Sequence, residues 1–142
     1  MKKVIITMLA AAVIINSPAA FASNWIEIGR TQDSSTQIEI DKDSIKHSGP
    51  VVKVWVREIT LIGAKLPGGG VLTGTRTPGG LKYDTLMNRQ TIDCSQGTVT
   101  FSSTEYFDHG SVVEAREGTE SGDIPPDTIP EIVERAVCKS KS

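Results

Sequence analysis

The stretch Arg89-Gln90-Thr91-Ile92-Asp93-Cys94 carries the first of only two cysteines in a chain of 142 residues. Its alternating polar and apolar residues are typical of the end of a β-strand. The second cysteine, Cys138, adjoins the apolar stripe of a predicted C-terminal helix. We predict that a disulfide joins Cys94 to Cys138, and that the segments between them pack around this link.

The N-terminus has the layout of a secretory signal peptide. Met1-Lys2-Lys3 is positively charged, residues 4–15 are apolar except for one threonine, and Ala20-Phe21-Ala22 is a small-residue cleavage motif. The apolar run is shorter than the roughly 20 residues that a membrane-spanning helix needs. We predict a signal peptide at 1–22 and a single mature domain at 23–142, with no membrane span, no lipid anchor, and a periplasmic or extracellular location.

Charge and cysteine content exclude several kinds of partner. Without Lys2 and Lys3, the 15 basic residues fall to 13 against 17 acidic ones, which argues against nucleic-acid binding. Two cysteines in an exported protein indicate one disulfide, with two free thiols as the alternative. The two histidines, His47 and His109, are far from both cysteines in sequence, so we predict no metal site and no cofactor.

Period-2 patterns predict an antiparallel sheet. The strongest strand, residues 51–60, places Val52, Val54 and Val56 on one face and Lys53, Trp55 and Arg57 on the other. In the predicted strand 98–107, Val99 and Phe101 share a face and Tyr106 takes the opposite one. The full set of predicted strands is 24–30, 37–41, 51–60, 81–94, 98–107 and 111–115.

Two segments are predicted as loops. Residues 61–80 hold seven glycines and two prolines, which favours a mobile hairpin tip. A phosphate-binding loop is excluded there, because its lysine is missing and no helix follows. Residues 116–127 are polar and rich in glycine and proline, which is typical of a surface loop.

The C-terminal segment is predicted to be a helix. Thr128 and Glu131 have the spacing of a capping box, and Ile129, Ile132, Val133, Ala136 and Val137 form one apolar stripe. We expect this helix to cover the valine face of residues 51–60. The predicted fold is therefore α+β: an antiparallel sheet of about six strands, a C-terminal helix packed on one face, and one disulfide.

Several short motifs, in order, resemble the surface-adhesin protein E family. They are Asp43-Ser44-Ile45, Val54-Trp55-Val56, a glycine-rich loop, Ile92-Asp93-Cys94, residues 101–106, Val112-Val113 and Cys138. The resemblance implies a small exported domain with an antiparallel sheet, a C-terminal helix and a strand-to-helix disulfide. It also implies binding to a host matrix or serum protein. The chain differs from the namesake adhesin in lacking a lipidated cysteine and in having only Lys82 and Arg89 as basic residues within 82–106.

Two non-enzymatic functions are therefore considered. The first is an exported binding protein. The alternative is a soluble periplasmic accessory or inhibitor protein with no role in host adhesion. No Ser-His-Asp, Cys-His or paired-carboxylate pattern points to one catalytic site, so we predict that the chain is not an enzyme.

Lys53, Trp55 and Arg57 are the candidate partner-binding residues. They share one strand face, opposite the valines, and aromatic and arginine side chains are frequent anchors of protein interfaces. The other interpretation of Trp55 is a residue at the boundary of the core, packed against the stems of Lys53 and Arg57.

Overall fold

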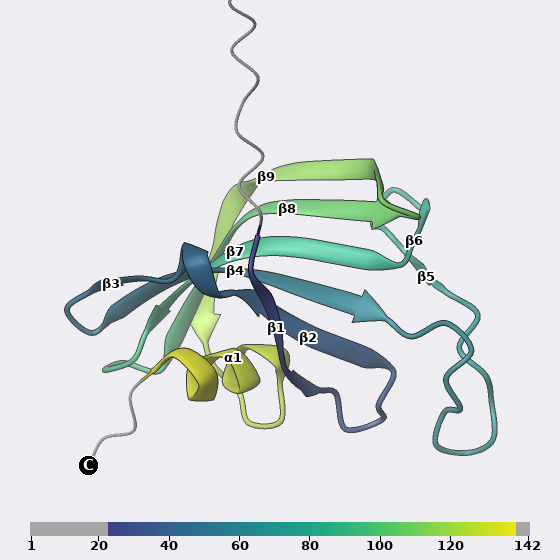
Figure 1. Cartoon of the computed structure of the whole chain (residues 1–142), viewed down its shortest axis with the longest axis horizontal. Helices are drawn as coiled ribbons and strands as arrows, with labels where there is room; N and C mark the ends of the chain where they lie inside the picture. Colours follow the sequence, from purple (N-terminus) through teal and green to yellow (C-terminus); the bar gives the residue numbers. More distant parts are fainter. Residues whose placement is uncertain (1–22, 139–142) are drawn as a thin grey trace, which may run out of the picture.

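The computed structural model describes residues 23–138, so the predicted signal peptide at 1–22 lies outside the described residues. The chain runs through strands, one 3-10 turn and a final helix (Figure 1). In order these are β1 (Trp25–Arg30), β2 (Thr36–Asp41), η1 (Lys42–Ser44), β3 (Lys46–Ser48), β4 (Val51–Thr60), β5 (Thr75–Arg76), β6 (Lys82–Tyr83), β7 (Thr85–Asp93), β8 (Thr98–Asp108), β9 (Ser111–Asp123) and α1 (Ile129–Val137).

Seven strands of the described chain form one antiparallel sheet. The order across it is β1-β2-β4-β7-β8-β9, and the short strand β3 also pairs with β4. Strands β5 and β6 form a separate two-stranded ribbon at one end (Figure 1). The predicted α+β fold with a C-terminal helix is confirmed, and within the seven-stranded sheet β3 is the strand that the sequence pattern did not indicate.

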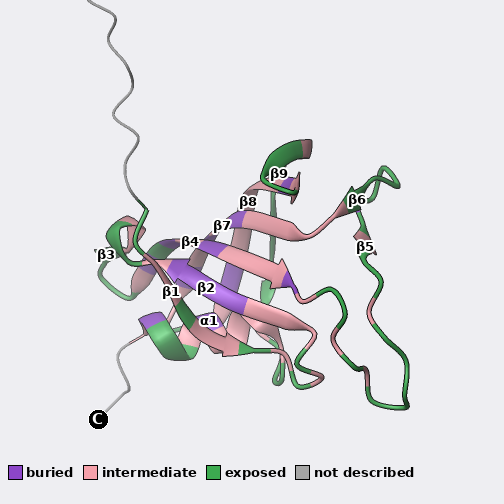
Figure 2. Ribbon diagram, turned by 45° about the vertical axis from the view of Figure 1, so that its right-hand side comes forward, coloured by how far each residue is buried: buried purple, intermediate pink, exposed green. Residues whose placement is uncertain are grey.

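The core lies between the sheet and α1. Val52, Val54 and Val56 are at most 2% exposed, and Val133 of the helix is fully buried against the same cluster. Figure 2 shows the buried residues gathered along the strands beside α1. Burying a valine of this kind contributes about 1.5–3 kcal/mol, so this face supplies most of the stabilising contact. The expectation that the helix covers the valine face is confirmed.

A disulfide links Cys94, just after β7, to Cys138 at the end of α1. The two Cα atoms lie 5.7 Å apart, within the usual range for a disulfide. Both cysteines pack against the apolar cluster between sheet and helix. The predicted tie between the strand end and the helix is confirmed.

The start of α1 differs in detail from a capping box. Thr128 is the N-cap residue, but its hydroxyl donates to the Pro125 carbonyl at 2.7 Å and does not cap the helix. Glu131 does reach back, where its Oε2 accepts from the backbone N–H of Asp127 at 2.8 Å. The turn of Pro125-Pro126 before the helix draws the threonine hydroxyl away from the first helical turn.

The prediction that 111–115 is a short strand and 116–127 a loop is wrong. Strand β9 continues to Asp123, because β8 offers it a partner along almost its whole length. Nearly all of β9 is exposed, so burial selects no apolar alternation there, and its glycines imitate a loop. A shift in register opposite Ser103, whose φ is 50°, accommodates Gly118 within the strand.

A second irregularity, in the pairing of β8 with β7, corrects the prediction for Tyr106. Phe101 pairs with Gln90 and Tyr106 pairs with Leu86, and both partners point to the helix side of β7. Tyr106 therefore lies on the same face as Val99 and Phe101. Opposite the step from Met87 to Arg89, β8 has one extra residue between Ser102 and Glu105, and this β-bulge reverses the alternation.

The segment predicted as a single strand at 81–94 is broken, and the long loop before it is partly ordered. Asp84 separates β6 from β7, and β5 within the predicted loop pairs with β6. Earlier in the loop, before β5, the Gly63 N–H donates to the Leu72 carbonyl at 2.8 Å, and Lys65 bridges to Val71. Residues 61–80 thus form a long loop whose arms are joined by backbone hydrogen bonds.

Candidate partner-binding surface

The predicted site residues Lys53, Trp55 and Arg57 lie on the sheet face opposite α1. They alternate along β4 with the buried Val52, Val54 and Val56. Trp55 is partly buried and Lys53 is exposed. The structure therefore brings all three to one face, but it gives them different surroundings.

Arg57 is held inside the sheet surface. Its Nε donates to Oε2 of Glu39 at 2.8 Å, and its Nη2 forms an ion pair with the same oxygen. Its guanidinium carbon lies 4.4 Å from the ring centroid of Trp25, which is the geometry of a cation–π contact. Gln37 donates to the other carboxylate oxygen of Glu39 at 2.8 Å. Arg57 thus serves as part of the floor of the surface.

Trp55 lies beside a hollow of about 400 Å³. Its backbone N–H donates to the Ser44 hydroxyl at 2.9 Å, and that hydroxyl donates to the Asp41 carbonyl at 2.7 Å. These bonds fix the 3-10 turn η1 against β4. The walls of the hollow include Trp55, Lys46 and Arg89.

Three cations surround Trp55. Arg89 is its direct cross-strand neighbour on β7, and Lys46 pairs with Lys53 across β3 and β4. Within residues 23–138, Lys46, Lys53 and Arg89 form no side-chain ion pair. We name the group of Lys46, Lys53, Trp55 and Arg89 the Trp55 surface. An aromatic ring flanked by free cations suits a carboxylate-bearing partner.

Two acidic residues, Asp41 and Asp43, also line the hollow, and Asp41 has structural partners. The side chain of Asp41 accepts from the backbone N–H groups of Asn24 and Asp43, both at 3.1 Å. Sequence reasoning missed Lys46 and Arg89 because they lie on other strands. Arg89 lies beside Trp55 only because β7 pairs with β4, and the local sequence pattern does not reveal that pairing.

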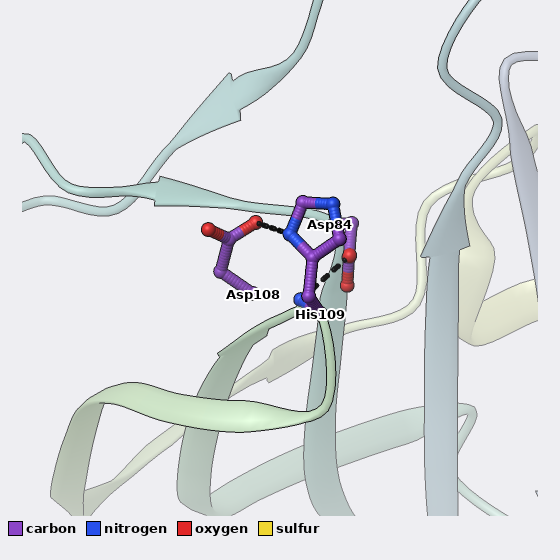
Figure 3. A group of neighbouring side chains, drawn as sticks. All are labelled: Asp84, Asp108 and His109. Atoms are coloured by element: carbon purple, nitrogen blue, oxygen red, sulfur yellow. Dashed lines mark hydrogen bonds and ion pairs between the residues drawn. The ribbon is translucent and has the colours of Figure 1, made fainter.

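A second group of polar side chains lies at the turn between β8 and β9 (Figure 3). Each of Asp84, Asp108 and His109 offers one possible metal-ligand atom, and these three atoms lie within 4.8 Å of one another. Asp84 accepts from the backbone N–H of His109 at 2.9 Å, and the His109 ring Nδ1 is 3.0 Å from Asp108. His109 has a φ of 50°, so these contacts hold a left-handed turn residue in place. Three ligands are fewer than the four of a structural zinc site, and we assign the group to the turn.

His47, the other histidine, lies exposed on β3 and pairs with Val52 of β4. It is thus on a different strand from His109, and the structure does not bring the two together.

Taken together, these features define a class of protein: a small α+β domain whose helix is tethered by a disulfide to one sheet face while the other face presents an aromatic and basic surface. The chain belongs to the surface-adhesin protein E family, whose model matches residues 25–139. It is therefore an adhesin-like protein of a family of surface or exported proteins.

Solved structures of similar fold come from Haemophilus influenzae. The selenomethionine form of its protein E is 14% identical, with a TM-score of 0.51, and the match covers 85% of this chain and 90% of that one. A second crystal form of protein E has the same identity and TM-score, with 89% and 96% covered. At this identity the likeness establishes the fold. No curated protein sequence matches the chain.

Within residues 23–138, α1 is too short to cross a membrane, and no other helix has the length and apolar character to do so.

Proposed function

We propose that the mature protein, residues 23–142 after removal of 1–22, is an exported, non-enzymatic binding protein. It holds a protein partner through the Trp55 surface. The observation that carries the proposal is the partly buried Trp55 among three cations that have no ion-pair partner in the described chain. The family description supports an adhesin role, and a host matrix or serum protein is the partner class that this role implies.

The positive charges of the Trp55 surface favour a partner that presents an acidic segment. Lys46, Lys53 and Arg89 provide positive charge on a protein whose overall formal charge is −2. A partner carboxylate near the Trp55 ring would gain charge-assisted hydrogen bonds, while the ring supplies apolar contact. Arg57 contributes indirectly by holding Glu39 and Trp25 in place. Such binding weakens as salt rises, because exposed charges are screened.

The test compares two double variants. Lys53→Ala with Trp55→Ala removes a cation and the aromatic ring from the surface. Lys82→Ala with Leu81→Ala removes an exposed cation and an exposed apolar side chain elsewhere. Binding to immobilised matrix and serum proteins should fall at least tenfold for the first variant and stay unchanged for the second. Circular dichroism on the same samples verifies folding. Equal binding by both folded variants would refute the proposal.

Location is tested separately. Protease treatment or antibody labelling of intact cells reaches the protein only if it is exposed at the surface. Complete protection would favour the alternative function, a soluble periplasmic accessory or inhibitor protein. In that case the same pair of variants is tested against proteins of the envelope.

A further inference from the structure

Glu58 is a carboxyl group on the core side of the sheet. It follows Val54 and Val56 on the face that α1 covers, and its cross-strand neighbours are Ile38 and Leu86. Hydrocarbon therefore flanks it on both sides. Among the described residues, no hydrogen bond donor and no cation reaches its carboxyl oxygens.

The protonation of Glu58 reflects this isolation. Burial raises its pKa to about 7, and no neighbouring charge or hydrogen bond contributes to the shift. Asp93, by contrast, accepts from the Ser95 hydroxyl and from two backbone N–H groups, which lower its pKa. Placing an acid in apolar surroundings without a partner costs free energy of folding. A position that is costly for folding is a candidate for binding.

A cavity of about 500 Å³ opens onto Glu58 from the start of α1. Phe101 of β8 and the side chains of Ile129, Pro130 and Ile132 line its apolar walls. This volume falls within the range of small-ligand sites. We name this space the Glu58 cavity.

The other charged groups of the Glu58 cavity come from β1 and from the helix region. Arg30 of β1 donates to Glu27 at 3.0 Å, and Arg135 lies 3.7 Å from Glu131. Both cations are exposed at the rim, as is Asp127. The pKa of Tyr106 on β8 is raised, chiefly by burial, and the charge of Glu58 adds to this rise. None of these groups pairs with Glu58, so a bound cation would be its ion-pair partner.

We propose that the Glu58 cavity binds an organic ammonium group carried on an aliphatic stem, the chemistry shared by a lysine side chain and a free alkylamine. The ammonium pairs with the Glu58 carboxylate, and the ring of Phe101 adds a favourable site for a cation. The stem contacts Ile129 and Ile132. This site lies on the face opposite the Trp55 surface and is independent of the function proposed for that surface.

The test uses n-butylamine as probe with the oxidised, ¹⁵N-labelled mature protein. Amide signals of residues 58, 101 and 129–132 should shift in a saturable way, whereas n-butanol, of similar length and without charge, should leave them unchanged. Glu58→Gln should weaken binding at least tenfold. Glu105→Gln, a carboxylate on the other face of β8, is the matched control and should bind as the parent does.

The pH dependence provides a second measurement. The ion pair needs an ionised Glu58 and a protonated amine, whose pKa lies near 10. Affinity should therefore rise about tenfold from pH 6 to pH 8, as expected for a carboxyl group with a pKa of about 7. The Glu58→Gln variant should show no such rise. If that variant fails to fold, the amine, alcohol and pH comparisons on the parent chain decide the question.

Two further probes distinguish the source of the ammonium group. Acetyl-lysine-methylamide with a free side chain represents a partner protein, and the same molecule acetylated at Nζ is its control. Tighter binding of the lysine compound than of butylamine indicates a protein side chain, and the reverse indicates a free amine. Either result supports the proposal. Shifts that are equal for butylamine and butanol, or that persist in Glu58→Gln, overturn it.

Discussion

Removing the disulfide should release α1 from the sheet. The change is the double variant Cys94→Ala with Cys138→Ala, which avoids leaving a free thiol. The bond joins residues 44 apart in sequence. In the chain-entropy model, a loop of this length is worth about 4 kcal/mol of stability at 25 °C. For a domain of this size, that loss should lower the melting temperature by about 15 °C.

The helix should respond more than the sheet. It has nine residues, and isolated helices shorter than about 12–15 residues are marginal in water. Its docking rests on Val133 and Val137, the two buried residues of the helix, together with the disulfide. Once the covalent link is gone, we expect amide exchange in α1 to accelerate more than exchange in β4 and β7.

Urea unfolding and hydrogen exchange measure the two effects. The parent protein in reducing buffer, with its cysteines free, should resemble the double variant. Gln96→Ala with Ser140→Ala is the matched control, because it changes neighbouring positions without breaking the link and Gln96 is exposed. A loss of less than about 1 kcal/mol in the cysteine variant, with unchanged exchange in α1, would refute the reasoning.

Three other predictions concern the core, Glu58 and the long loop. Val133→Asp places an unpaired carboxylate at a fully buried position and should lower the free energy of unfolding by several kcal/mol. Ile132→Asp, at a partly buried position, should lower it less. Thermal melts that rank the two variants the other way would contradict the observed packing. Because the pKa of Glu58 is raised from 4.5 to about 7 in the folded state, the native protein holds a proton that the unfolded chain has lost, so stability should fall by about 1–3 kcal/mol as the pH rises from 4.5 to 7. Glu58→Gln should remove this part of the pH profile of urea unfolding, and a profile unchanged by the substitution would argue against a buried acid. In limited proteolysis, trypsin should cut first at Lys65 or Arg76, both of which are exposed. Of the two we expect Lys65, because a single β-bridge holds it whereas Arg76 lies in β5. First cleavage elsewhere would show that residues 61–80 are better protected than their exposure implies.

Local chemistry made several features predictable. Valines that alternate with Lys53, Trp55 and Arg57 indicate a strand with one buried face, and this pattern placed both faces of β4 correctly. The apolar stripe of α1 follows from helical periodicity in the same way. With only two cysteines, the pairing had one intramolecular solution. The family resemblance stated from short motifs is confirmed by the match over residues 25–139.

Features that depend on pairing between distant segments could not be read from the chain. The path of β9 to Asp123 depends on a partner strand, and the face of Tyr106 depends on a bulge whose position only the register reveals. The partial burial of Glu58 depends on β2, β7 and α1, which the sequence of β4 alone does not place beside it.

The sequence by itself determined the sheet-and-helix composition, the buried face of β4 and the cysteine pair, because hydrophobic periodicity and covalent chemistry act locally. Only the tertiary structure decided which side chains from different strands meet. It set Arg89 and Lys46 beside Trp55, paired Arg57 with Glu39, and enclosed Glu58 near the start of α1. Strand register and helix docking govern these contacts, and both result from the balance of packing over the whole chain.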